Sequence, residues 1–312
     1  MKSILMTGCL LLAFIQSSWL QAEEHRIVLG GKNFTEQFLL ARITSLILQE
    51  RGFVVEEELN LSTIEIRQAI LDQKIDLYWE YTGTAYSAIH RLSDPEVIAD
   101  AEKLYTAVKG LDEERGLIWL DKASLNNTYS LVVPAKLAET HRLASISDLG
   151  VLAQIDSSLT MGADGVFIRR PDGLRQMLQH YGFSFGPGNI IELQGNRPAY
   201  SLLQRGRLQV GMAFATDPQI YAHDLVVLED DLGFFPVYNP APVIRREVLE
   251  RHPELESLLN SLPGFLNDKE MIQLNYAVDI DNKSVDQVAR EWLIGKGLIS
   301  DTQSVSEMPE AG

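Results

Sequence analysis

Residues 75–84, with the sequence Ile-Asp-Leu-Tyr-Trp-Glu-Tyr-Thr-Gly-Thr, are the feature that most constrains the fold. A helical run precedes them, and residues 75–81 are apolar on both faces, which is typical of an interior strand of a parallel sheet. The Thr-Gly pair then ends the strand, and Thr84 can cap a following helix. We therefore predict an α/β fold in which Tyr81 lies at the carboxyl end of a central strand, where open α/β sheets bind their ligands.

A second copy of this pattern lies at residues 208–217, where Phe214 aligns with Tyr81. Each copy follows a helix rich in Leu or Ile, and each ends a strand with an aromatic residue and a turn that contains Thr. Two such α/β units are expected of a two-lobed protein that closes on one ligand. The alternative is that Tyr78, Trp79 and Tyr81 are only core aromatics, because most aromatic clusters serve packing.

The first 22 residues have the pattern of a cleavable signal peptide. Lys2 is followed by an apolar run over residues 4–15, which is too short to span a bilayer, and we expect cleavage after Ala22. The only cysteine, Cys9, lies inside this segment, so the mature protein would have no disulfide. The chain of 312 residues is long enough for two domains of ordinary size, and we expect an exported, soluble, periplasmic protein.

Charge and motif content exclude several classes of function. Without Lys2 the chain has 26 basic and 43 acidic residues, a net charge of about −17, which argues against nucleic acid and anionic membrane surfaces. There is no Gly-x-Ser-x-Gly, no His-Glu-x-x-His and no phosphate-binding lysine loop. The six histidines lack metal-ligand spacing. We therefore expect no enzyme, no metal and no cofactor.

Binding has more support. Four aromatic residues are expected at strand ends or crossover points: Tyr81, Tyr129, Phe214 and Tyr238. Aromatic faces that converge on one point suit a quaternary ammonium group, which has no N–H to donate.

Arg170, Lys32 and Asn33 could hold a carboxylate at the other end of such a ligand. The alternative for Arg169 and Arg170 is a solvated pair at the start of a helix. For Lys32 and Asn33 it is helix capping, with Asn33 or Thr35 as the cap.

Six motifs resemble those of the glycine betaine/carnitine/choline-binding proteins of osmoprotectant ABC transporters. They occur in the family's order and span roughly residues 26–300: Gly31-Lys-Asn-Phe-Thr-Glu-Gln37, Asp76-Leu-Tyr-Trp-Glu-Tyr-Thr-Gly-Thr84, Asn126-Asn-Thr-Tyr129, Phe167-Ile-Arg-Arg-Pro-Asp-Gly173, Ala215-Thr-Asp217 and Pro236-Val-Tyr-Asn-Pro-Ala-Pro-Val243. The resemblance implies a type II periplasmic-binding-protein fold, with two α/β lobes joined by two crossover strands and a ligand clamped between them. It places lobe I at residues 23–128 and 239–312 and lobe II at residues 129–238.

The resemblance also implies roles for individual residues. Tyr81, Tyr129 and Tyr238 belong to the aromatic cage, and Phe214 occupies a cage position usually held by tyrosine. Arg170, rather than Arg169, binds the carboxylate of the ligand, and Lys32 assists. Trp79 replaces a proline common in the family, which we expect to put an extra aromatic residue near the mouth of the site.

The resulting hypothesis is a monomeric periplasmic protein that binds a quaternary ammonium solute and delivers it to an ABC permease in the inner membrane. Three alternatives stay open. The ligand could be another trimethylammonium compound such as ergothioneine, the protein could be a ligand sensor that docks on a membrane receptor, or the same bilobed fold could support an enzyme.

Overall fold

The computed structural model describes residues 25–301 except residues 171 and 196. The expected signal peptide, with Cys9, lies outside the described residues. Within the described part of the chain, no helix is both long enough and apolar enough to cross a membrane.

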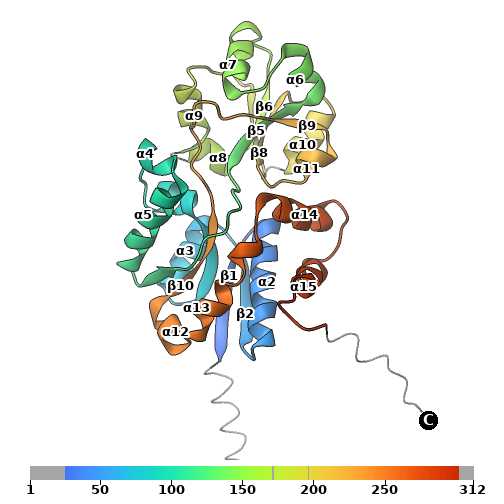
Figure 1. The fold of residues 1–312 in the computed structure, drawn as a ribbon. Coiled ribbons are helices and arrows are strands. Elements are labelled where there is room, and N and C mark those ends of the chain that lie inside the picture. The colour runs from blue at the N-terminus through green and yellow to red at the C-terminus, as the bar shows by residue number, and fades with distance from the viewer. Residues whose placement is uncertain (1–24, 171, 196, 302–312) are drawn as a thin grey trace, which may run out of the picture. The chain divides into compact units, whose positions relative to one another are not determined.

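Within the described residues, ten strands form two sheets of five strands each; most of them are labelled in Figure 1. The first sheet has the order β2 (Val54–Leu61), β1 (Arg26–Lys32), β3 (Leu77–Tyr81), β10 (Pro240–Arg245) and β4 (Leu117–Trp119). The second has the order β7 (Ile190–Leu193), β6 (Met161–Asp164), β8 (Val210–Phe214), β5 (Tyr129–Pro134) and β9 (Leu225–Leu228). In the first sheet β1 is parallel to both β2 and β3, and in the second β6 is parallel to both β7 and β8. The strands β10 and β4 are antiparallel, as are β5 and both of its neighbours.

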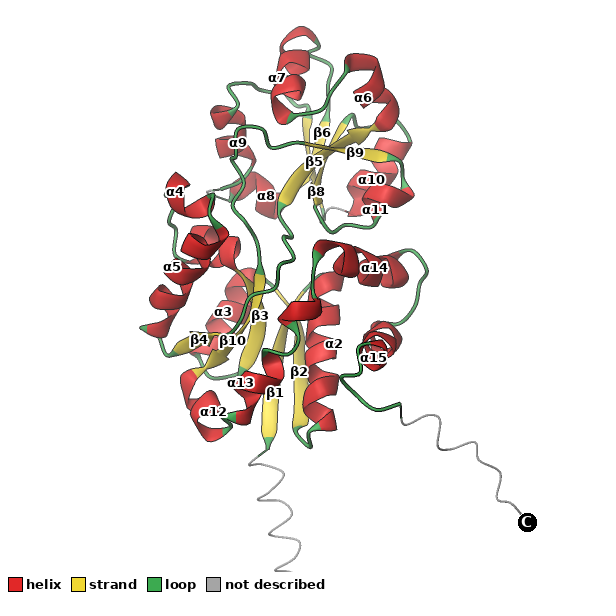
Figure 2. Cartoon of the chain, viewed as in Figure 1, coloured by secondary structure: helices red, strands yellow, loops and turns green. Residues whose placement is uncertain are grey.

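Helices connect the strands, as Figure 2 shows. In chain order they are α2 (Thr35–Glu50), α3 (Thr63–Leu71), the π-helix η1 (Thr84–Ile89), α4 (Pro95–Ile98), α5 (Ala101–Glu113), α6 (Ala135–His141), α7 (Ile146–Ile155), α8 (Gly165–Arg169), α9 (Leu174–His180), α10 (Arg197–Gln204), α11 (Gln219–Ala222), α12 (Arg246–Arg251), α13 (Glu254–Leu259), the 3₁₀-helix η2 (Pro263–Phe265), α14 (Asp268–Asp279) and α15 (Val285–Gly295). The alternation of strands and helices along the chain is that of an α/β protein.

The prediction for residues 75–81 is confirmed. Strand β3 is buried at every position and pairs with β1 in parallel, with Leu29 opposite Leu77. Two predicted caps are wrong. Helix α2 has Phe34 as its N-cap, rather than Asn33 or Thr35. The chain is already helical at Thr82 and Gly83 and continues into η1 with Gly83 as the N-cap, so Thr84 is the first residue of η1 and does not cap it.

The described residues group into two compact units. The first unit contains residues 25–79, 247–258 and 284–301, and the second contains residues 80–246 and 259–283. These units are defined by internal contacts, whereas the predicted lobe boundaries follow the crossover strands, and those boundaries stay a prediction.

Each unit has its own packing. In the first unit α2 contacts α15, and Arg42 joins them by a hydrogen bond of 2.7 Å from Nε to Asp286 Oδ1. In the second unit a buried cluster fills the space between the sheet and α10; its members include Val132, Tyr200, Leu203, Ala213 and Ile220.

Candidate ligand-binding site

Five aromatic rings of the second unit form a cluster around Tyr129. Their residues are Tyr129, Phe167, Phe214, Phe235 and Tyr238, and we call them the aromatic cluster. The Tyr129 centroid lies 4.9 Å from that of Phe167, 5.0 Å from Phe214, 6.1 Å from Phe235 and 5.7 Å from Tyr238. Tyr238 presents its ring to Tyr129 at 86°, an edge contact of the kind that aromatic pairs favour.

The sheet register explains the contact between Tyr129 and Phe214. Tyr129 is the first residue of β5 and Phe214 is the last of β8, and the two strands are antiparallel with these residues directly opposite each other. Side chains opposite each other on one face of such a pair are close neighbours. The aromatic residue that the sequence places at the end of β8 therefore meets the aromatic residue that begins the crossover strand.

Arg170 contacts this cluster. Its guanidinium carbon lies 5.2 Å from the ring centroid of Tyr129 and 6.0 Å from that of Tyr238, within the range of a cation–π interaction. The guanidinium donates from Nε to Asp172 Oδ1 at 2.8 Å and from Nη2 to Oδ2 at 2.5 Å. The hydroxyl of Tyr238 also donates to Asp172 Oδ2, at 3.0 Å. Arg170, Asp172 and Tyr238 thus form one connected group.

The neighbouring arginine behaves differently. Arg169 is exposed and pairs with Glu192 at 2.8 Å, with side-chain exposures of 64% and 55%. The side chains of Arg170 and Asp172 are exposed by only 9% and 11%. The alternative of a solvated arginine pair therefore holds for Arg169 and is wrong for Arg170.

Burial raises the pKa values of the phenols in the cluster further above neutral pH. Burial raises the pKa of Tyr129 to about 12 and raises the pKa of Tyr238 well above its ordinary value, so both phenols are neutral at pH 7. Burial alone would lower the pKa of Arg170, but Tyr129, Tyr238 and Asp172 raise it well above its ordinary value. The site therefore combines neutral ring faces with a permanently charged guanidinium.

Tyr238 is held by the Asn-Asn-Thr motif that precedes β5. Its backbone N–H donates to Asn126 Oδ1 at 2.8 Å, and its carbonyl accepts from the Asn127 N–H at 3.2 Å. The Thr128 hydroxyl donates to the carbonyl of Pro236 at 3.2 Å. Residues 126–128 and 236–239 thus run side by side and fix each other's backbone.

The turn after Tyr81 is bound to the same segment. Tyr81 is itself 4% exposed. The Thr82 N–H donates to the Asn239 carbonyl at 3.0 Å, and the Thr82 hydroxyl donates to the Val237 carbonyl at 2.9 Å. A Cβ atom on Gly83 would lie 2.8 Å from the ring of Tyr238, so only glycine fits beneath this ring. The Thr-Gly pair therefore serves the contact with Tyr238.

The turn after Phe214 is closed by its own residues. Asp217 Oδ2 accepts from the Phe214 N–H at 2.8 Å and from the hydroxyl of Tyr200 on α10. Asn275 of α14 donates from Nδ2 to the Thr216 carbonyl at 3.2 Å.

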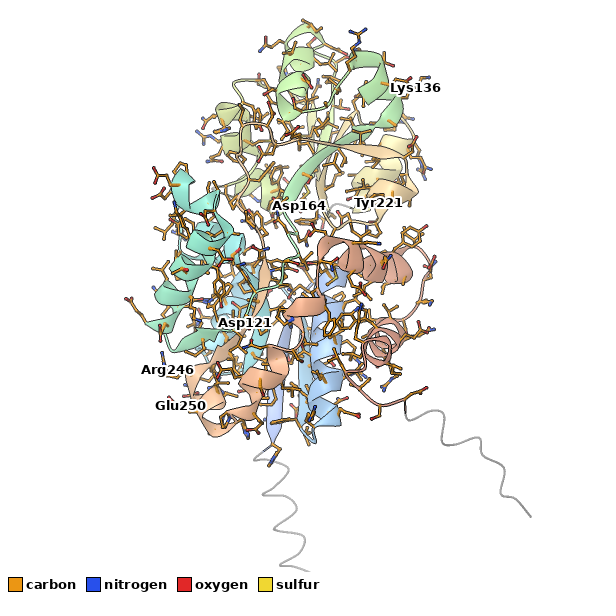
Figure 3. The ribbon with its side chains drawn as sticks, viewed as in Figure 1. Asp121, Lys136, Asp164, Tyr221, Arg246 and Glu250 are labelled. Atoms are coloured by element: carbon orange, nitrogen blue, oxygen red, sulfur yellow. The ribbon has the colours of Figure 1, made fainter. Side chains whose placement is uncertain are left out.

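Asp164, labelled in Figure 3, begins the segment that carries Arg170. It is the N-cap of α8, and its Oδ1 accepts from the Phe167 N–H at 2.6 Å. Burial raises the pKa of Asp164. At the other end of the segment, a Cβ on Gly173 would lie 2.0 Å from the Phe167 carbonyl oxygen, so the chain can return over α8 only with glycine at this position.

The structure brings Tyr129, Arg170, Phe214 and Tyr238 together in the second unit and ties the turn after Tyr81 to Tyr238. Lys32 and Asn33 belong to the first unit. Lys32 is 3% exposed, its backbone N–H donates to Gln37 Oε1 at 3.3 Å, and Asn33 is exposed. Their role toward a ligand stays a prediction.

The placement of Trp79 near the mouth of a site is wrong. Its side chain is 1% exposed inside the first unit, where the indole Nε1 donates to Thr44 Oγ1 of α2 at 2.8 Å. Its carbonyl accepts from Gln37 Nε2 at 3.2 Å. For Trp79 the alternative of a core aromatic residue is correct, because β3 is covered on the face that carries this side chain.

Sequence reasoning missed Phe167, Phe235 and Asp172 as members of the site. Phe167 and Asp172 both lie inside a motif that was assigned only through Arg170, and an acidic residue two positions after a candidate buried arginine was the available signal. Phe235 is fixed by Asp230 Oδ2, which accepts its N–H at 2.8 Å. Among the residues that the structure describes, no three acidic, histidine or cysteine side chains are grouped as metal ligands.

The two sheets follow the same strand pattern, in which β7, β6, β8, β5 and β9 take the places of β2, β1, β3, β10 and β4. This pattern and the buried aromatic cluster define the class of protein. This is an α/β solute-binding protein with the type II periplasmic-binding fold, and a solved structure described as a glycine betaine/carnitine/choline ABC transporter matches it. That structure has a TM-score of 0.74 and 26% identity, over 88% of this chain and 100% of the other.

Residues 25–295 match the family described as the substrate binding domain of ABC-type glycine betaine transport systems. The chain belongs to this family. It is 36% identical to a glycine-betaine-binding protein of Pseudomonas aeruginosa over 311 residues, 97% of this chain and 98% of the relative. It is also 32% identical, over 278 residues and 88% of its length, to an ergothioneine transport permease/ergothioneine binding protein of Helicobacter pylori, of which the match covers 48%.

Proposed function

We propose that this protein binds a trimethylammonium solute at the aromatic cluster and presents it to an ABC importer. The observation that carries the proposal is the group of neutral ring faces around Tyr129, at 5.0 Å from Phe214 and 5.7 Å from Tyr238, beside a buried arginine. A quaternary ammonium group cannot donate hydrogen bonds, so ring faces and shape are what a protein can offer it. Each face contributes about 0.5–2 kcal/mol, so several together give useful affinity.

The carboxylate of such a solute has a partner in Arg170. Asp172 accepts from Nε and Nη2 of this arginine, and the hydroxyls of Tyr129 and Tyr238 are further partners. A guanidinium has five N–H donors, so it can serve one more acceptor. A ligand carboxylate bound there would form a charge-assisted hydrogen bond. Lys32 is proposed to assist Arg170, and Asn33 to add a polar contact.

Two ligand classes are supported by named relatives. The Pseudomonas aeruginosa relative is named for glycine betaine and the Helicobacter pylori relative for ergothioneine. Both compounds carry a trimethylammonium group, which the aromatic cluster would bind, and a carboxylate, which Arg170 would bind. Glycine betaine, choline or carnitine is the first expectation, and ergothioneine is the second.

The proposal includes the cellular setting. The protein is exported with a cleavable signal peptide, acts as a monomer in the periplasm, and docks on the permease of its transporter with its ligand unchanged. A sensor role would use the same site with a membrane receptor in place of the permease. Genes for a permease and an ATPase beside this one would favour transport.

Calorimetry of the purified protein against glycine betaine, choline, carnitine, proline betaine and ergothioneine tests the ligand class. We expect one-to-one binding of at least one of them, and mass spectrometry should recover the bound compound unaltered. Absence of binding to all five compounds would overturn the ligand class, and chemical turnover would overturn the binding-only role.

A further inference from the structure

Asp172 is the member of the site whose contacts the proposed function does not explain. Its two carboxylate oxygens accept from Nε and Nη2 of Arg170, and one of them also accepts from the hydroxyl of Tyr238. Both side chains of the ion pair are nearly buried, at 9% and 11% exposure. A buried charge that loses its partner is strongly unfavourable, so this pairing decides how much of the charge of Arg170 the site experiences.

The geometry has two consequences for a ligand. The side-on pairing through Nε and Nη2 fixes the plane of the guanidinium, and so fixes where Nη1 lies beside the hydroxyl of Tyr129 and toward a ligand carboxylate. The same pairing cancels the positive charge of a guanidinium whose carbon lies 5.2 Å from the ring centroid of Tyr129, where a ligand cation would bind. Without that cancellation, the positive charges of Arg170 and of the ligand would both lie at the aromatic cluster.

We propose that Asp172 is the positioning residue of this site and sets its selectivity between cationic and zwitterionic trimethylammonium ligands. This inference rests on the proposed function. By neutralising Arg170, Asp172 lets a cation such as choline occupy the aromatic cluster. By orienting Arg170, it keeps Nη1 available to the carboxylate of a zwitterion such as glycine betaine.

Four variants separate the two effects. Asp172→Asn removes the charge and keeps the size of the side chain, whereas Asp172→Glu keeps the charge and displaces the carboxylate. Arg170→Ala removes the guanidinium, and the double variant Arg170→Ala with Asp172→Asn removes both charges together. Glu139→Gln is the matched control, since Glu139 is exposed on α6 and the substitution changes the net charge by the same amount.

Affinities for choline and glycine betaine are measured by calorimetry, with competition against the tightest ligand where binding is weak. In Asp172→Asn we expect choline to lose about tenfold more affinity than glycine betaine, because an uncompensated charge a few ångströms away acts through an effective dielectric constant of about 20. Asp172→Glu should restore choline binding and leave glycine betaine weakened. In Arg170→Ala glycine betaine should lose more affinity than choline. The double variant should bind choline as the unaltered protein does.

Equal losses for both ligands in Asp172→Asn, or a double variant that binds choline as weakly as Asp172→Asn, would overturn the inference. If the unaltered protein binds none of the five compounds named above, the proposed function fails instead, and thermal unfolding then tests the pairing by itself. Asp172→Asn should lower the melting temperature by several degrees and the double variant should recover part of that loss. Additive losses would show that the two charges are not coupled and would overturn the inference.

Discussion

The two strand–turn units of the chain share a sequence pattern but are held in different ways. Both β3 and β8 end in an aromatic residue, and a turn that contains Thr follows each of them. The alignment of Phe214 with Tyr81 predicts both segments. The turn after β3 binds to a segment distant in sequence, through Thr82 and the backbone of Val237 and Asn239. The turn after β8 is closed by Asp217, three residues from Phe214.

This difference determines what each turn contributes to the site. The turn after β3 is coupled to Tyr238, because the same segment that binds Thr82 carries that ring. The turn after β8 is closed by Asp217 and is also held by Tyr200 of α10, Asn275 of α14 and the carbonyl of Thr128, none of which carries a ring of the aromatic cluster. A disturbance of the first turn should therefore reach the ligand directly, whereas a disturbance of the second should mainly lower the stability of its own strand end.

Gly83→Ala should have the largest effect on ligand affinity. The added Cβ would lie 2.8 Å from two ring carbons of Tyr238 and 2.9 Å from the Val237 carbonyl oxygen, so ring and backbone must both move. Overpacking of this kind costs about 1–3 kcal/mol, and displacement of Tyr238 should lower affinity by about tenfold or more. Calorimetry and denaturant unfolding measure the two effects.

Gly110→Ala is the matched control for this substitution. Gly110 lies exposed within α5, and no atom lies within 4 Å of its added Cβ. Alanine should stabilise the helix by about 0.5–1 kcal/mol and leave ligand affinity unchanged. An affinity in Gly83→Ala equal to that of this control would mean that the contact with Tyr238 does not matter for binding.

Asp217→Ala should have a smaller effect on affinity and a clear effect on stability. It leaves the Phe214 N–H and the Tyr200 hydroxyl without the acceptor they share, which costs about 1–3 kcal/mol of unfolding free energy. Affinity should fall by about threefold, because Phe214 keeps its place opposite Tyr129 through the strand register. The comparison between the turns fails if this variant loses more affinity than Gly83→Ala does.

Asp231→Ala serves as the control for Asp217→Ala. Asp231 is exposed, and its hydrogen-bond partners are the side chain and backbone of Ser147, whose N–H lies at 3.2 Å, and its own backbone. Its loss should cost less than about 0.5 kcal/mol, which is usual for surface positions away from such features. A cost similar to that of Asp217→Ala would show that the buried acceptor of the turn has no special weight.

Phe214→Tyr tests the departure from the family's usual residue. The ring is half-buried and opposite Tyr129, so it keeps its face and gains a hydroxyl. We expect a change in affinity of about twofold or less, because a typical net hydrogen bond contributes about 0.5–1.5 kcal/mol and the cost of desolvating the hydroxyl offsets part of it. Phe214→Ala is the reference, since it removes the ring face and should weaken every trimethylammonium ligand. Should the two variants lose affinity equally, the ring of Phe214 would not contact the ligand.

The sequence was sufficient for the α/β fold and for the central aromatic residues, because strand burial and aromatic position follow from local periodicity. It was not sufficient to predict which side chains contact Arg170 and Trp79. Asp172, two positions after Arg170, was a signal in the sequence, but local pattern could not show that its carboxylate pairs with the guanidinium in the folded chain. Likewise, β3 is buried on both faces, so local pattern could not decide that Trp79 packs against α2 rather than near a ligand.

Trp79→Phe should have the smallest effect on ligand affinity, which distinguishes the core of the first unit from the two turns. The indole is buried and donates to Thr44 Oγ1, so phenylalanine should lower the unfolding free energy by about 1–2 kcal/mol through the lost hydrogen bond and the lost volume. Thr44→Val removes the same hydrogen bond from the other side, and the two variants together should cost less than their sum. Any ligand-induced change in tryptophan fluorescence should persist in Trp79→Phe, because the environment of this buried indole is set by α2. If the fluorescence change disappears while affinity is kept, Trp79 reports on the ligand after all, and the assignment of this side chain to the core of its unit is wrong.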